Sequence, residues 1–368
     1  MNPGLRRAHV ALALLAMAGC TQEIVLPISP AAADEPFDAS PLRRRDTLAP
    51  SPDANEEDPI PDAALPSADA AIPACRALEH PVKQHHPKLI VALDRSASMF
   101  RKTGGAAQAP IQWVQDSLRS FMETYTDVIY FGYEEFPISP KAVECGQSCC
   151  ASKVMPAPVS VADIDGRWSC AGQPAWCKDT FSESPSYDAL GRITDYYYGL
   201  ADDVPGPRYV LLLTDHDPWC PGVTAAKACQ RTIEQTSMLR RLFPYVKTLV
   251  FGLSDLVSGS LCLSEVAHHG GLARDPNKFP SHYVALNAAD FTKQLGEQLA
   301  LMARDVCTFS VDQYVKSLAV SLDGVPVPHD GMDGWEWVSD YRFQLNGRAC
   351  DTMLTSTSVA IDVQQCRH

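Results

Sequence analysis

Positive charge is scarce in this sequence. Its 368 residues include 31 Lys and Arg against 44 Asp and Glu, which gives a formal net charge of −13 at pH 7. Proteins that bind nucleic acid usually present a basic face to the phosphates, so this balance argues against that class. The net charge does not indicate which partner the protein binds. A length of 368 residues is sufficient for one or two domains.

Sequence motifs of common catalytic sites are also missing. The chain contains no Gly-x-Ser-x-Gly, no Gly-x-x-x-x-Gly-Lys and no His-Glu-x-x-His. Its two histidine pairs, His85-His86 and His268-His269, are adjacent, so their side chains diverge, unlike the i, i+4 pair of a helical zinc site. Because no nucleophile and base can be placed together, we expect that the protein is not an enzyme.

The apolar run near the N-terminus, Val10 to Met17, is too short to span a bilayer. Two arginines precede it and two small residues separate it from Cys20, a pattern typical of a targeting segment. It resembles a bacterial lipoprotein signal, which implies removal of residues 1–19 and lipidation of Cys20. Thr21 in the second mature position resembles outer-membrane sorting in a Gram-negative cell. A plain secretory peptide with an incidental cysteine is the alternative.

Residues 20–74 contain no aromatic residue except Phe37 and are rich in Pro, Ala, Asp and Ser. Such a composition cannot bury enough apolar surface to fold, and proline with like charges keeps a chain extended. We therefore expect a disordered acidic tether that holds the folded part off the membrane. Its Arg43-Arg44-Arg45 run is either a contact with lipid headgroups or a solvated charge run.

Apart from Cys20, the sequence has twelve cysteines. An even number in an exported chain predicts up to six disulfides, whose connectivity the sequence does not give. Zinc is the competing interpretation, because three of the cysteines lie close together. Their spacing is not a repeated C-x₂-C pair, and an oxidising compartment favours disulfides. The twelve are Cys75, Cys145, Cys149, Cys150, Cys170, Cys177, Cys220, Cys229, Cys262, Cys307, Cys350 and Cys366.

From Cys75 to Cys307 the pattern alternates between short apolar runs and segments of helical periodicity. This alternation predicts an α/β fold: a doubly wound, mostly parallel sheet with helices on both faces and right-handed connections. The expected strands are 89–93, 128–136, 208–214, 246–253 and 282–286. The expected helices are 111–125, 187–200, 224–243, 263–268 and 288–306.

Polar side chains follow the first of these strands directly. Asp94, Ser96 and Ser98 lie at its carboxyl end, where open parallel sheets place their binding sites. One carboxylate and two hydroxyls are ligands that suit a hard cation such as Mg²⁺. The alternative is an ordinary turn, in which Asp and Ser are common.

Two more segments join this motif in a resemblance. The Asp94-x-Ser96-x-Ser98 stretch, Ser184-Pro-Ser186 before a helix, and Thr214-Asp215 after an apolar strand resemble the metal-ion-dependent adhesion site of von Willebrand factor A domains. The resemblance covers roughly residues 86–306. It implies a doubly wound sheet that holds a divalent cation at one edge.

The resemblance also implies a role for each matched residue. Ser96 and Ser98 match hydroxyls that bind the ion directly, Asp94 and Asp215 match carboxylates that reach it directly or through water, and Ser184 stands where the family usually has Thr. The cation would be Mg²⁺, with Mn²⁺ or Ca²⁺ as alternatives. Its partner would be a protein or surface ligand that presents a carboxylate. Loop capping is the alternative role for Ser184 and Asp215 taken separately.

Two features depart from the family pattern. His216 follows Asp215 where the family usually has Gly, and we expect it to be a supporting or surface residue. A Cys-rich insert of about 137–183 is longer than usual and is expected to lie at the rim of the metal face. Its Trp168 and Trp176 are either anchors for a partner or packing residues.

The expected fold suggests three disulfides. Cys75 and Cys307 flank the 75–307 domain and are expected to pair, and Cys220 and Cys229 could close a small loop. The tail, residues 308–368, alternates apolar and polar residues between turns, and Asp323-Gly324 is a strong hairpin signal. It predicts a small β-rich C-terminal unit stapled by Cys350 and Cys366.

Together these patterns predict an exported, lipid-anchored envelope protein that binds a protein or surface ligand through a divalent metal ion. A different class remains open on sequence grounds. The chain could be a structural scaffold of the envelope in which the metal only stabilises the loops.

Overall fold

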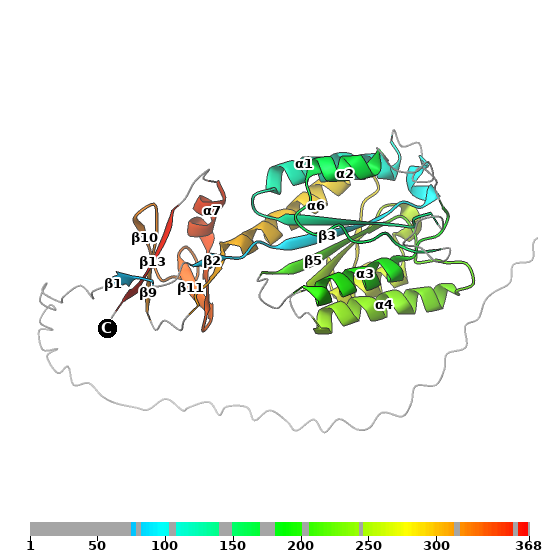
Figure 1. Ribbon diagram of the computed structural model, residues 1–368. Coiled ribbons are helices and arrows are strands. Elements are labelled where there is room, and N and C mark those ends of the chain that lie inside the picture. Colours follow the sequence, from blue (N-terminus) through cyan, green and yellow to red (C-terminus); the bar gives the residue numbers. More distant parts are fainter. Residues whose placement is uncertain are drawn as a thin grey trace, which may run out of the picture. The chain divides into compact units, whose positions relative to one another are not determined.

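The computed structural model describes most of the chain from Cys75 onward (Figure 1). The signal segment 1–19, the lipidation candidate Cys20 and the tether 20–74 lie outside the described residues. Within the described part, no helix is both long and apolar enough to cross a membrane. The described residues are 75–78, 82–102, 108–139, 149–169, 181–200, 206–242, 246–312, 317–355 and 360–366.

A five-stranded parallel sheet in the order β4-β3-β5-β6-β7 forms the larger part of the structure. Every residue of β3 is buried, as expected for a strand that is covered on both faces. The expected strands are confirmed, although the last is shorter than its sequence pattern indicates. The bounds are β3 (Lys88–Asp94), β4 (Tyr130–Phe136), β5 (Arg208–Thr214), β6 (Val246–Gly252) and β7 (Tyr283–Val284).

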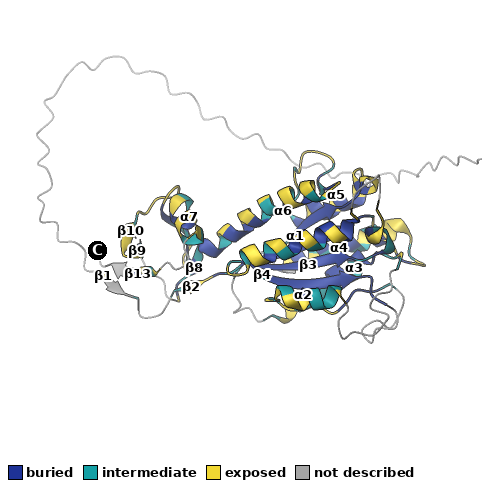
Figure 2. Ribbon diagram, turned by 90° about the horizontal axis from the view of Figure 1, so that it is seen from above, coloured by how far each residue is buried: buried dark blue, intermediate teal, exposed yellow. Residues whose placement is uncertain are grey.

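Helices cover both faces of this sheet, which confirms the doubly wound α/β fold (Figures 1 and 2). Alternate residues of β3 point to opposite faces: Leu89 and Val91 pack in the cluster that includes α1, α2 and α6, whereas Ile90 and Ala92 pack in the cluster that includes α3, α4 and α5. The bounds are α1 (Pro110–Tyr125), α2 (Val161–Trp168), α3 (Ser186–Gly199), α4 (Ala225–Leu242), α5 (Leu261–Gly270) and α6 (Ala288–Ala303).

The C-terminal unit contains two antiparallel four-stranded sheets, β1-β13-β9-β10 and β11-β12-β8-β2. Strands β1 and β2 precede the parallel sheet in the sequence, yet they pair with β13 and β8 from the end of the chain. The bounds are β1 (Cys75–Ala77), β2 (Lys83–Gln84), β8 (Thr308–Ser310), β9 (Leu318–Leu322), β10 (Val325–Val327), β11 (Trp335–Ser339), β12 (Arg342–Leu345) and β13 (Ile361–Cys366).

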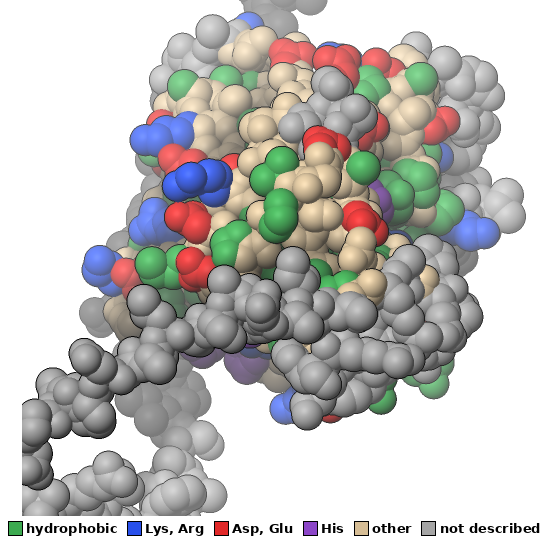
Figure 3. All heavy atoms as spheres, turned by 90° about the vertical axis from the view of Figure 1, so that its left-hand side faces the viewer, with side chains coloured by type: hydrophobic (Ala, Val, Ile, Leu, Met, Phe, Trp, Pro, Cys, Tyr) green, Lys and Arg blue, Asp and Glu red, His purple; other side chains and the backbone are tan. Residues whose placement is uncertain are grey.

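The predicted hairpin at Asp323-Gly324 joins β9 to β10, and both residues have positive φ, 49° and 77°. Helix α7 (Gly347–Thr355) was not expected from the sequence. The core of this unit combines aliphatic residues with an aromatic group, in which Phe309 is stacked on Phe343 at 5.2 Å between ring centroids. On the face seen in Figure 3, acidic and basic side chains are interspersed with apolar ones, which is typical of a solvated surface.

Three disulfides lie within the described residues, and one of them shows that the expected Cys75–Cys307 pairing is wrong. Cys307 pairs with Cys350 and not with Cys75, because helix α7 packs beside the turn that follows α6. The three are Cys149–Cys220, Cys229–Cys262 and Cys307–Cys350.

Two other expected pairings are also wrong. Cys229 lies in α4 and pairs with Cys262 of the neighbouring α5, so it does not close a loop with Cys220. The expected Cys350–Cys366 staple is excluded by the bond from Cys350 to Cys307. Cys75 is disulfide-bonded, and the register of β1 with β13 places its α-carbon opposite that of Cys366.

Candidate metal centre

The candidate centre lies where the direction of the sheet's connections reverses. Strands β3 and β5 are neighbours at the middle of the sheet, but the chain continues from β3 to β4 on one side and from β5 to β6 on the other. Open α/β sheets bind ligands outside the carboxyl ends of strands at such a reversal. Asp94 ends β3 and Asp215 follows β5, so both carboxylates are at this position.

Asp94 is completely buried and is held by donors from three segments. Its Oδ1 accepts a hydrogen bond from the backbone N–H of Ser96 at 2.7 Å. Its Oδ2 accepts bonds from Ser184 Oγ at 2.8 Å and from Thr214 Oγ1 at 2.6 Å. Burial raises the pKa of Asp94, and the charge of Asp215 adds to this effect against an opposing one from His216.

The two hydroxyls of the first motif face Asp215. Ser96 Oγ and Ser98 Oγ lie 3.0 Å apart, and Ser98 Oγ donates to Asp215 Oδ1 at 2.9 Å. Ser96 Oγ is 3.5 Å from the same carboxylate oxygen. The extended strand followed by a 3₁₀ turn, Ala97–Phe100, turns both hydroxyls to one side of the loop.

Ser184 reaches the centre because its segment pairs with the loop after β5. The backbone N–H of Ser184 donates to the carbonyl of Trp219 at 2.8 Å, and the reverse bond measures 3.0 Å. Ser254 secures the same loop by donating from Oγ to the carbonyl of Asp215 at 2.8 Å. The structure thus brings together all five side chains that the sequence analysis singles out: Asp94, Ser96, Ser98, Ser184 and Asp215.

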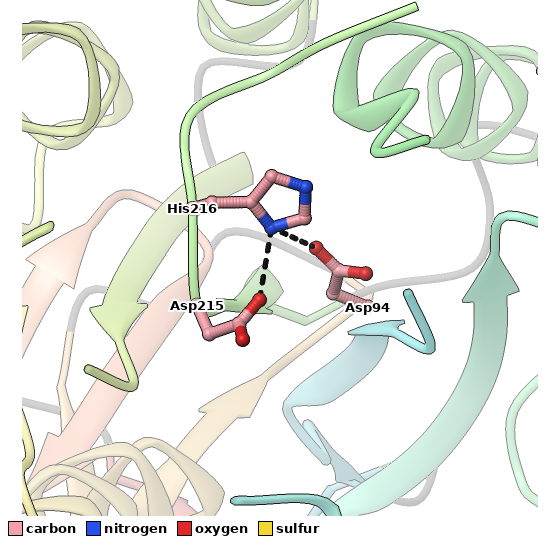
Figure 4. Close-up of side chains that lie close together, drawn as sticks. All are labelled: Asp94, Asp215 and His216. Carbon is pink, nitrogen blue, oxygen red and sulfur yellow. Dashed lines mark hydrogen bonds and ion pairs between the residues drawn. The ribbon is translucent and has the colours of Figure 1, made fainter. Parts of the chain in front are cut away.

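The ring of His216 is turned toward the two carboxylates (Figure 4), and 26% of its side chain is exposed to solvent. Its Nδ1 lies 2.8 Å from Asp215 Oδ1 and 3.6 Å from Asp94 Oδ2. Burial alone lowers the pKa of His216, but the hydrogen bond to Asp215 and the two negative charges outweigh it and raise the pKa to about 9. The sequence shows the residue but not the turn that directs its ring inward.

The Cys-rich insert is attached to the same loop. The Cys149–Cys220 disulfide joins the two segments, and the Sγ of Cys149 lies 3.6 Å from the carbonyl oxygen of Trp219. Trp168 of the insert packs on β4, where its Nε1 donates to Tyr133 Oη at 2.9 Å, so it is a packing residue. Trp176 lies outside the described residues.

A second polar network links the centre to the insert. Glu135 of β4 is almost fully buried and binds Arg95, which follows Asp94, at 2.9 Å. Its other oxygen binds Arg167 of α2 at 2.7 Å. Neither the sequence motif nor its spacing indicates these two ion pairs of the buried Glu135, which hold the backbone directly after Asp94 and helix α2 of the insert to β4.

The donor set fits a divalent cation. Adjacent ligands of an octahedral ion bound at about 2.1 Å are separated by about 3 Å. The closest donor pairs of the centre are separated by 2.8 to 3.6 Å, and the carboxylates Asp94 and Asp215 with His216 form a group whose ligand atoms all lie within 4.8 Å of one another. Two buried carboxylates also repel each other, which a cation between them would relieve.

No protein-family model and no curated protein matches the sequence. Among solved structures, the chain is similar to the pilus adhesin SpaC from Lactobacillus rhamnosus GG, with 11% identity, a TM-score of 0.42 and coverage of 77% of this chain and 39% of that one. An aerotolerance-related membrane protein from Bacteroides fragilis has 12% identity and a TM-score of 0.37, over 58% of this chain and 98% of that one. Manganese-loaded TRAP protein from Plasmodium vivax has 12% identity and a TM-score of 0.38, over 58% and 74%. The chain therefore spans about two fifths of the length of SpaC.

Proposed function

We propose that this chain is a von Willebrand factor A-type protein that binds a protein or surface ligand through a divalent cation. The observation that carries the proposal is the convergence of Asp94, Ser96, Ser98, Ser184 and Asp215, from three distant segments, at the carboxyl ends of β3 and β5. Mg²⁺ suits the oxygen donors, and Mn²⁺ or Ca²⁺ are the alternatives.

In the proposed recognition, some residues of the centre orient the two carboxylates that would bind the cation. Thr214 and the backbone of Ser96 orient the Asp94 carboxylate, while Ser98 orients Asp215. With only two acidic groups in a mainly neutral shell, a bound cation supplies a positive centre that attracts one more anionic oxygen. A glutamate or aspartate of the partner has the chemistry to provide it.

A purely structural role for the cation is the alternative, and two contacts argue against it. The backbone pairing of Ser184 with Trp219 and the Cys149–Cys220 disulfide already join the Ser184 segment and the insert to the loop after β5. A cation would therefore add little to the order of these loops. We accordingly propose a binding role for the site and no catalytic step.

We further propose that the protein is exported and anchored in the cell envelope through a lipid on Cys20, with residues 20–74 as the spacer. The outer membrane of a Gram-negative cell is the proposed location. The three described disulfides support export, because such bonds persist in oxidising compartments.

A peptide selection tests the recognition proposal. The folded protein, immobilised in Mg²⁺, is presented with a phage-displayed random peptide library, and bound phage are eluted with EDTA. We expect the eluted peptides to be enriched in Asp and Glu, and Asp94→Asn to yield no EDTA-eluted pool. Asp195→Asn, an exposed aspartate on α3, is the matched control and should behave as wild type. Peptides without carboxylate enrichment, or an identical pool from Asp94→Asn, would contradict the proposal.

A further inference from the structure

We propose that His216 Nδ1 is itself a ligand of the cation, so that the site prefers an ion with affinity for imidazole, such as Mn²⁺, over Mg²⁺. The inference rests on the proposed function in one respect, namely that the site holds a divalent cation. It concerns a residue of this chain at which the family pattern has glycine, and therefore a ligand that the family pattern does not supply.

The position of the ring is the first argument. Nδ1 is 2.8 Å from Asp215 Oδ1 and 3.6 Å from Asp94 Oδ2, while the serine hydroxyls lie 2.9 to 3.5 Å from one another and from Asp215. A cation that bridges Asp94 and Asp215 would be within reach of this nitrogen. The three side chains also form the group of acidic and histidine ligand atoms that lie within 4.8 Å of one another.

The orientation of the ring is the second argument. Figure 4 shows Nδ1 facing the two carboxylates while the other ring nitrogen is turned away from them. The ring also makes a hydrogen bond to the backbone of Ser182. Metal-bound histidines are usually held in this way, because a backbone carbonyl that accepts the second N–H fixes the ring and its tautomer.

The chemistry of the donors then sets the choice of ion. Mg²⁺ prefers oxygen ligands and gives up its water reluctantly, whereas Mn²⁺ and the later divalent ions accept imidazole nitrogen, with affinity rising from Mn²⁺ toward Cu²⁺. An all-oxygen site already favours Mn²⁺ slightly, so the informative quantity is how far the preference changes when the nitrogen is removed.

A different arrangement makes the opposite prediction. If His216 only forms an ion pair with Asp215, a cation must first displace the ring. Removing the imidazole would then strengthen the binding of Mg²⁺ and Mn²⁺ alike.

The experiment compares wild type with His216→Gly and His216→Asn. His216→Asn offers an oxygen in place of the nitrogen, and His269→Asn on α5 is the control at an exposed histidine. Isothermal titration gives the dissociation constants for Mg²⁺ and Mn²⁺. Electron spin-echo spectroscopy of the Mn²⁺ complex reports a directly bound ¹⁴N, and circular dichroism checks that each variant is folded.

We expect both His216 variants to lower the preference for Mn²⁺ over Mg²⁺ by about tenfold or more and to lose the ¹⁴N signal of wild type. His269→Asn should keep both. Absence of a bound ¹⁴N in wild type, or tighter binding of both ions by His216→Gly, would overturn the inference while leaving the recognition proposal intact. If no ion binds wild type at all, the cation proposal fails and this inference fails with it.

Discussion

The candidate metal centre and the C-terminal unit are held together by opposite kinds of interaction. At the centre, buried carboxylates and hydroxyls from three segments bind one another through hydrogen bonds such as Thr214 to Asp94. In the C-terminal unit, stacked aromatic residues and the Cys307–Cys350 disulfide form an apolar core. Desolvated charges cost free energy, whereas buried rings stabilise the fold.

This difference predicts that substitutions in the C-terminal unit affect stability most, whereas substitutions at the candidate centre affect ligand binding most. In the proposed function, side chains such as Asp94 bind a cation, and as buried charges they contribute little net stability by themselves. Side chains such as Phe343 contribute stability and touch none of the candidate ligands. Substitutions in the C-terminal unit should therefore change the free energy of unfolding without changing the affinity for metal, and substitutions at the centre should change the affinity for metal.

The largest expected effect comes from Phe343→Ala. Phe343 is completely buried against Phe309, Trp335 and Trp337. Truncating such a residue removes its buried surface and leaves a cavity, at a cost of about 3 to 5 kcal/mol. Urea unfolding measures the loss, and calorimetry on the protein that remains folded should give an unchanged dissociation constant for Mg²⁺. A changed constant would mean that the two regions are coupled.

Removing the Cys307–Cys350 bridge should have the next largest effect. The bond closes a sequence separation of 43 residues, so the double variant Cys307→Ala/Cys350→Ala should lose roughly 2 to 4 kcal/mol. The double variant leaves no unpaired thiol of this bridge behind. Chemical denaturation under non-reducing conditions measures the loss, and stability equal to that of wild type would show that the apolar core suffices.

Metal should stabilise the protein only when Asp94 is intact. At one hundred times its dissociation constant, a ligand that binds only the folded state adds about 2.7 kcal/mol to the free energy of unfolding. Melting curves with and without Mg²⁺ should show this gain in wild type and none in Asp94→Asn. Each variant is compared with itself, so any change in stability without metal cancels. An equal gain in Asp94→Asn would place the ion elsewhere.

The smallest effect should follow acidification at His85, which lies between β2 and β3, where its backbone N–H donates to Thr308. Neither ring nitrogen has a hydrogen-bond partner among the described residues, and burial, followed by nearby positive charges, lowers the pKa of His85 to about 4. Between pH 6.5 and 4 the unfolded chain therefore binds a proton that the folded chain does not. Stability should fall as the pH falls through this window, by about 2 kcal/mol.

His85→Leu should remove this part of the pH dependence in a series of melting curves. The exposed variant His269→Leu serves as the control and should retain the wild-type profile. If His85→Leu and wild type lose stability in parallel on acidification, the buried histidine is not the cause.

Four of the five candidate ligands, Asp94, Ser96, Ser98 and Asp215, follow apolar strands whose carboxyl ends meet at one edge of a parallel sheet. Ser184 precedes a helix, and it was predicted only because its segment resembles part of the adhesion site of von Willebrand factor A domains. The strand at Leu89–Leu93, the helix from Pro110 and the turn at Asp323-Gly324 likewise have local signals that tertiary packing did not override. Short-range pattern and strand order were sufficient for these features.

Other features depend on contacts that no local pattern encodes. The disulfide partner of Cys220 lies 71 residues away, so its proximity to Cys229 suggested the wrong pair. For Cys307, the expected closeness of the two domain ends suggested Cys75, whereas the partner is Cys350 of a helix that was not expected. Helix α7 is short and begins at a glycine, which concealed it. The inward turn of His216 depends on the path of its loop, and the pairing of Ser184 with Trp219 depends on two segments meeting in space.

The anomalous X-ray signal of Mn²⁺ in crystals of the folded protein would locate a cation at the candidate centre directly. We predict one peak at the carboxyl ends of β3 and β5, between about 2.0 and 2.6 Å from Ser96 Oγ and Ser98 Oγ. Asp94→Asn crystals should lack it. A wild-type map with no peak at this position, or with the peak too far from Ser96 Oγ and Ser98 Oγ for either to bind the ion, would contradict the proposed metal centre.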